Sequence, residues 1–156
     1  MKDLKSGEQK WLTKAVVGII LADGIIEKDQ VTFIKKLSSV FVEEESKETL
    51  LEISGLLRVK EFPQLEGIKV DNIEHLIYML DVLSAAVFAN GKKLNEETAK
   101  YFEAGQKMGI NIGTLSYRIS LEAEKFRVKR KLVEIRENIR KDHLFSLSPR
   151  GYWLEF

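Results

Sequence analysis

Apolar side chains recur at intervals of three and four residues along most of this 156-residue sequence. In the first such stretch, Leu12, Val16, Ile19 and Ile20 share one face of a helix that we expect over residues 8–22. The same periodicity predicts helices over 28–40, 44–57, 71–89, 95–108 and 114–141, the last with an interruption near Ser120. Strand-like alternation is too short to use, and only 10 residues are Gly and 2 are Pro. The sequence therefore predicts an all-α protein, a compact bundle of about six to seven helices.

Two of these helix ends carry local signals. Asp71 followed by Glu74 predicts a capped helix start, and Gly109 predicts a helix end. His75 lies four residues after Asp71, a spacing that admits either a two-ligand metal fragment or an ordinary surface histidine.

The composition is that of a soluble globular domain. With 44% apolar and 31% charged residues, a 17.9 kDa chain can bury a core of its own. It has no Cys and 2 His, which excludes disulfides, thiolate nucleophiles and multi-His metal sites. The apolar run 15–22 is too short to span a membrane and lacks a signal-peptide cleavage pattern, so we expect a cytoplasmic protein.

A short internal repeat divides the helical part of the chain. The triplets Ala-Asp-Gly at 22–24 and Ala-Asn-Gly at 89–91 lie 67 residues apart, each at the end of an apolar helix. Allowing one extra residue in the second half, Phe33 matches Tyr101 and Ile34 matches Phe102. We therefore expect two pseudo-symmetric helical hairpins, with Gly24 and Gly91 as their structural turns.

This repeated pattern, an apolar helix ending in Ala22-Asp23-Gly24 and followed by an acidic helix start, resembles the TerB-like domain of tellurite-resistance proteins. The resemblance covers residues 12–119 of a helical domain expected over 8–119, and leaves out the C-terminal part, 120–156. It implies a non-enzymatic all-helical domain linked to stress response and membrane-associated complexes, with metal or partner binding at the acidic turns.

Carried onto this sequence, the resemblance places the first motif acid at Asp23 and puts Asn90 where the second acid would stand. The acid usually found seven residues later is Gln30 in the first half and, with the extra residue, Thr98 in the second. These departures weaken a paired-carboxylate metal site, because amide and hydroxyl groups offset the dehydration of a hard cation less well than carboxylates do.

Asp23, Glu27 and Asp29 form the first candidate binding site, and Asp23 is the candidate metal ligand. Oxygen ligands on a tight turn would suit Ca²⁺ or Mg²⁺, although the spacing is not that of an EF-hand. The alternative is that Asp23 ends one helix, while the later acids complement the dipole of the next.

Two charged segments are candidate docking surfaces. Glu43, Glu44 and Glu45 begin an acidic helix face, which is either solvated or a surface for a basic partner. The segment 125–141 has eight bases and two acids, a charge of +6 against −5 for the rest of the chain, with Lys129, Arg130 and Lys131 at its densest point.

The basic segment also carries an aliphatic stripe: Leu121, Val128, Leu132, Ile135 and Ile139. Such a helix can bind an acidic protein surface or anionic lipid, whereas nucleic acid ranks last because no recognition motif accompanies the charge. We expect the stripe to pack on the bundle and the bases to face outward. The four aromatic residues near the C-terminus are expected to fold back or to meet a partner.

No phosphate-binding loop, nucleophile elbow or zinc signature is present in the sequence. The hypothesis is therefore a non-catalytic TerB-like interaction or scaffold module of a bacterial stress-response or envelope-associated assembly. It binds protein partners and needs no cofactor. The alternatives are a divalent-cation sensor and a protein peripheral to the inner face of the membrane.

Overall fold

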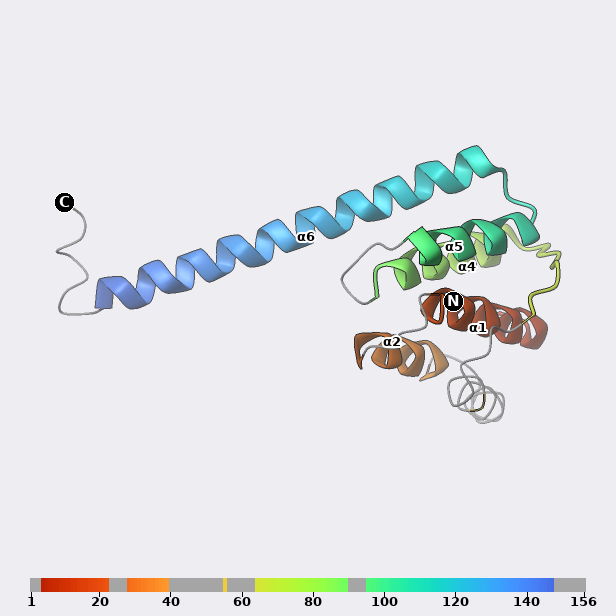
Figure 1. The fold of residues 1–156 in the computed structure, drawn as a ribbon, viewed down its shortest axis with the longest axis horizontal. Helices are drawn as coiled ribbons and strands as arrows, with labels where there is room; N and C mark the ends of the chain where they lie inside the picture. Colours follow the sequence, from red (N-terminus) through yellow and green to blue (C-terminus); the bar gives the residue numbers. More distant parts are fainter. Residues whose placement is uncertain (1–3, 23–27, 40–54, 56–63, 90–94, 148–156) are drawn as a thin grey trace. The chain divides into compact units, whose positions relative to one another are not determined.

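The computed structural model describes residues 4–22, 28–39, 55, 64–89 and 95–147. Within these ranges the regular secondary structure is helical and includes no strand, which confirms the all-α prediction (Figure 1). The helices are α1 (Ser6–Ile20), α2 (Lys28–Ser39), α4 (Ile73–Val87), α5 (Asn95–Lys107) and α6 (Ile112–Leu147). The helix expected over 44–57 lies outside the described residues except for Gly55.

The chain divides into two compact units, 1–120 and 121–156. Within the described residues, the first unit is a bundle of α1, α2, α4, α5 and the first turns of α6. The second unit contains the remainder of α6, which is helical to Leu147.

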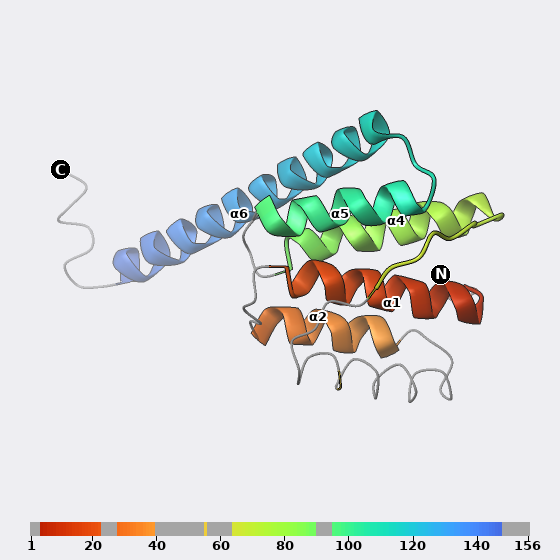
Figure 2. The ribbon, with the colours of Figure 1, turned by 45° about the vertical axis from the view of Figure 1, so that its right-hand side comes forward.

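Helix α1 lies at the centre of the bundle and contacts α2, α4 and α5 (Figure 2). Its Leu12, Val16, Val17, Ile19 and Ile20 have no exposed surface. A helix on the surface buries one stripe, whereas a helix surrounded by others buries most of its circumference. Helix α1 is of the second kind, because it packs between α2 on one side and α4 and α5 on the other.

The residues before α4 join it to the rest of the bundle. Trp11 Nε1 donates a hydrogen bond to the Glu66 carbonyl at 2.7 Å, and the Ile68 amide donates to Lys107 O at 3.0 Å. Asn72, and not the expected Asp71, caps α4: its side-chain oxygen accepts from the Glu74 amide at 2.9 Å. Asn and Asp are comparable N-caps, so the sequence pattern alone did not separate the two neighbours.

Helix α5 ends at Lys107 in a tight turn around Gly109, as predicted, and Gly109 has φ of +80°. The Ile110 amide donates to Gly105 O and the Gly109 amide donates to Gln106 O, the two hydrogen bonds of a Schellman motif. The fully buried Tyr101 joins α5 to the start of α6 by donating from its hydroxyl to Leu115 O at 2.9 Å.

Helix α6 runs from Ile112 to Leu147 without the interruption expected near Ser120. The Ser120 hydroxyl donates to the Ser116 carbonyl at 2.9 Å, which satisfies it inside the helix. Asn111 begins the helix by accepting a hydrogen bond from the Gly113 amide at 2.7 Å.

Replacing Gly109 tests the turn after α5. A Cβ at this position would meet nothing within 4 Å, so the cost of Gly109→Val comes from its backbone conformation alone. We expect the free energy of unfolding to fall by more than about 1 kcal/mol, measured by urea denaturation, and Gly109→Asn to cost less.

Gly7→Ala in α1 is the matched control, because its Cβ also meets nothing within 4 Å but its backbone is helical. This variant should leave stability unchanged or raise it slightly. Equal urea midpoints for Gly109→Val and the wild type would contradict the left-handed turn.

Candidate functional site

The described residues contain some of the candidate site residues and not others. Asp29 lies in the first turn of α2, and Lys129, Arg130 and Lys131 lie on α6; all four are exposed. The remaining candidates lie outside the described residues: Asp23, Glu27, Asn90, Glu43, Glu44, Glu45, Gly24 and Gly91.

Asp29 stands where a carboxylate complements the positive end of the α2 dipole. Across the described ranges no group of three or more His, Cys, Asp or Glu side chains is arranged to hold a metal ion. The divalent-cation hypothesis therefore depends on Asp23 and Glu27, and it stays a prediction.

Two polar side chains are fully buried at the third position of their helices, Gln30 in α2 and Glu97 in α5. They are 67 residues apart, the spacing of the two Gly turns in the sequence. Thr98, expected from the extra residue to be the counterpart of Gln30, is only half-buried. An alignment without the extra residue places Glu97, seven residues after Asn90, opposite Gln30.

Burial along α2 and α5 follows the same 67-residue spacing. The buried positions Ile34 and Leu37 of α2 correspond to the buried Tyr101 and Ala104 of α5. The match with an extra residue instead pairs half-buried Phe33 with buried Tyr101. The two helices thus bury the same positions, with no insertion between them.

His75 is not a free surface histidine. Its Nδ1 lies 3.0 Å from Oε1 of Glu8, and the two side chains are only 14% and 6% exposed. The same carboxylate accepts a hydrogen bond from the Lys5 amide at 2.9 Å. Glu8 thereby links the start of α1 to the start of α4.

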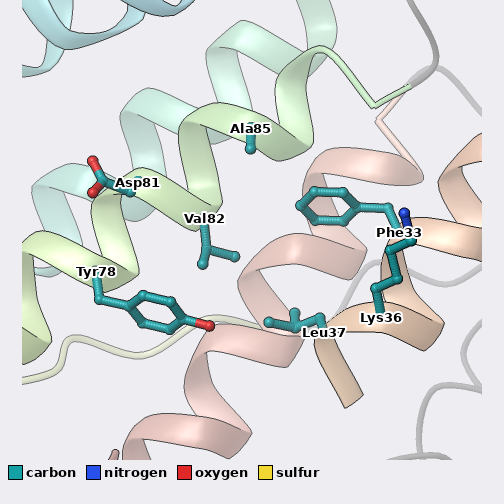
Figure 3. A pocket seen from close by; sticks show the side chains of 7 residues that line it. All are labelled: Phe33, Lys36, Leu37, Tyr78, Asp81, Val82 and Ala85. Carbon is teal, nitrogen blue, oxygen red and sulfur yellow. The ribbon is translucent and has the colours of Figure 1, made fainter. Parts of the chain in front are cut away.

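An apolar groove of about 310 Å³ lies between α2 and α4 in the bundle (Figure 3). Its lining residues are Phe33, Lys36, Leu37, Tyr78, Asp81, Val82 and Ala85. The Tyr78 ring points across the groove toward Leu37, and partial burial raises the pKa of its hydroxyl above the ordinary value of 10.0. Asp81 at the edge is held by Arg118, whose Nε donates to it at 3.0 Å.

The basic segment is the most exposed part of the described chain, since every residue from 127 to 147 is exposed. Three of its bases pair with acids one turn away on the helix: Arg127 with Glu124, Lys131 with Glu134 at 3.7 Å, and Arg140 with Glu137 at 3.4 Å. Arg130 instead lies over the Phe126 ring, 5.9 Å from its centroid.

No described helix combines the length and the apolarity needed to cross a membrane. In the comparisons with known proteins, no family model, no curated protein and no solved structure matches this chain. The geometry of the described residues is therefore the basis for a functional proposal.

The adjacent acids Glu96 and Glu97 provide a test of the buried polar position in α5. Glu97 has no exposed surface, whereas Glu96 is exposed. We expect Glu97→Ala to lower the free energy of unfolding by about 1–3 kcal/mol, since it leaves a cavity and removes a buried polar group. Glu96→Ala, the control, should change it by less than about 0.5 kcal/mol in the same urea series. Similar losses for both variants would show that burial at 97 carries no special cost.

The pKa of Tyr78 predicts an alkaline effect on stability. Above pH 10 the unfolded chain loses the Tyr78 proton while the folded chain keeps it, so this group makes the folded state less stable as pH rises. Tyr78→Phe should therefore lose less stability than the wild type between neutral and alkaline pH, measured by urea denaturation. An identical alkaline loss in both proteins would contradict the raised pKa.

Proposed function

We propose that this chain is a non-catalytic interaction and scaffold module of the TerB-like type, acting in a bacterial stress-response or envelope-associated assembly. The all-α bundle is consistent with such a domain. In this proposal the bundle is a rigid support, and the long helix α6 presents the surface that a partner binds.

The observation that carries the proposal is the exposure of the basic segment. Large aliphatic side chains usually lie in a core, yet Val128, Leu132 and Ile135 are about half exposed, at 46%, 47% and 52%. They are surrounded by bases that give the segment a net charge of +6. Exposed apolar side chains with charged neighbours are typical of interaction sites.

The pseudo-symmetry expected from the repeat is part of this proposal. It is supported by the shared burial of α2 and α5 at 67-residue spacing. Helices α1 and α4 follow the same spacing: Leu12 and Val16 are fully buried, and so are Met79 and Leu83. In this view two helical hairpins pack face to face and bury equivalent positions.

A second candidate function is peripheral binding to an anionic membrane at the cytoplasmic face. It is favoured by the eight bases of segment 125–141, because each base near an acidic lipid surface contributes favourable free energy of binding. Flotation with vesicles that contain or lack phosphatidylserine separates this function from binding to a protein partner.

Neutralising Lys129, Arg130 and Lys131 to Gln tests the role of the basic segment. All three are exposed, so we expect the thermal midpoint to change little. Binding to an acidic protein partner or to anionic vesicles should weaken, and more strongly at low salt, where the charges are less screened.

The control neutralises three exposed bases of the first unit, Lys35, Lys69 and Lys107, which changes the net charge by the same amount. If this control weakened binding equally, net charge and not the α6 surface would account for the effect. A large loss of stability with unchanged binding in the first variant would show that the three bases serve the fold.

A further inference from the structure

The aliphatic residues of the second unit follow the spacing of a coiled coil. Leu121, Val128, Leu132, Ile135 and Ile139 are separated by seven, four, three and four residues, which places them at positions d, d, a, d and a of successive heptads. All five lie on α6 and are between 46% and 60% exposed. We call these five residues the seam. The remaining a position within it is Lys125.

The seam does not continue the row of α6 that carries Leu115 and Ile119. Leu115 and Ile119 are the α6 residues buried in the core of the first unit. Residues seven apart lie on nearly the same side of a helix, and the series that begins at Ile119 continues with Phe126 and Val133. None of these three residues belongs to the seam. Leu121 follows Ile119 by two residues, about 200° around the helix. The seam is therefore a second apolar face of α6.

The charges on and beside the seam suit a second copy of this chain less well than an acidic helix. Positions e are Glu122, Lys129 and Arg136, and positions g are Glu124, Lys131 and Asn138. In a parallel pair Lys131 would face Arg136 of the other copy and Lys125 would face its own counterpart, while Glu124 would face Lys129. In an antiparallel pair in the same register Lys129 and Lys131 would each face their own counterparts, while Glu122 would face Arg136. Destabilising contacts between bases therefore arise in either orientation, beside the contacts between acid and base.

The same charges are complementary to an acidic helix. Within the described part of the chain, Lys125, Lys129 and Arg136 form no ion pair, in contrast to Arg127, Lys131 and Arg140. A partner helix with Glu at its e and g positions, and opposite Lys125, would pair with these three bases. A single Lys at an a position also selects the register and the partner of a coiled coil.

A membrane surface fits the seam less well. Helices that lie in a lipid interface have a broad apolar face and keep their charges on the other side. The seam is narrow, as in a coiled coil, and bases lie all around the helix, including Arg130 and Lys141 away from it. The other exposed aliphatic residues of α6 beyond Leu121, which are Val133, Leu144 and Leu147, also lie away from the seam.

We propose that residues 121–139 of α6 form a coiled coil with an acidic amphipathic helix of a partner protein. The inference rests on the proposed function, because it names the class of partner for that interaction module. The seam is short, fewer than three heptads, so the pairing is expected to be reversible.

The test uses the full-length chain and a synthetic helix of about 21 residues, three heptads, with Leu or Ile at a and d and Glu at e and g. One a position of this acidic peptide is Glu, to meet Lys125. A second peptide with Lys in place of every Glu is the control. Isothermal titration should show binding of the acidic peptide and none of the basic one.

Matched variants of adjacent residues locate the binding surface. Leu132 is in the seam and Val133 is not, and the two are 47% and 59% exposed. We expect Leu132→Asn to weaken binding of the acidic peptide at least about tenfold, and Val133→Asn to change it by less than about twofold. Lys129→Glu with Arg136→Glu should also abolish binding, whereas Arg130→Glu with Lys141→Glu, off the seam, should retain most of it.

Four other results would each contradict the proposed coiled coil, and each would indicate a different role for the seam. Equal effects of Leu132→Asn and Val133→Asn, with binding to anionic vesicles, indicate a membrane surface. A dimer in light scattering that Leu132→Asn dissociates indicates a second copy. No peptide binding, with a lower thermal midpoint for Leu132→Asn, indicates that the seam packs on the bundle. If a protein partner binds but neither the seam nor its flanks matter, the proposed function stands and the coiled coil fails.

Discussion

Burial of α1 on nearly all sides is the constraint on which the bundle depends. Five of its aliphatic side chains have no exposed surface, and each contributes about 1.5–3 kcal/mol when removed from water. A helix in this position must also satisfy its polar side chains inside the protein. Thr13 donates to the Gln9 carbonyl at 2.8 Å, the Gln9 amide group donates to Leu4 O at 2.8 Å, and Glu8 meets His75. Local hydrogen bonds thus allow polar residues on a buried helix.

The helices themselves could be predicted from apolar periodicity, because that pattern reports which residues are withdrawn from water. Their details depended on interactions that periodicity does not record. The predicted break at Ser120 did not occur, since a serine inside a helix can donate to the carbonyl four residues before it. The central position of α1 could not be predicted from periodicity either, because the residues that cover its second side come from helices far away in the sequence.

The candidate site was less predictable than the fold. Tyr101 and Phe102 are both large and aromatic, so the sequence allowed either to match Ile34, and matching Phe102 placed the expected counterpart of Gln30 at Thr98 instead of the buried Glu97. A buried carboxylate follows no hydrophobic pattern, and only the fold reveals it. The groove between α2 and α4 was missed for a similar reason: it joins residues from two helices whose sequences carry no shared motif.

The charge distribution explains how the chain can expose a seam of large aliphatic side chains. Exposed apolar rows promote association of identical copies unless something opposes it. Here bases at positions 125, 129, 131 and 136 stand on or beside the seam, and two copies would bring several of them together. This repulsion lowers the affinity of the chain for a second copy only, because a helix of opposite charge is attracted by the same bases. The bases that make the segment soluble would therefore also select its partner.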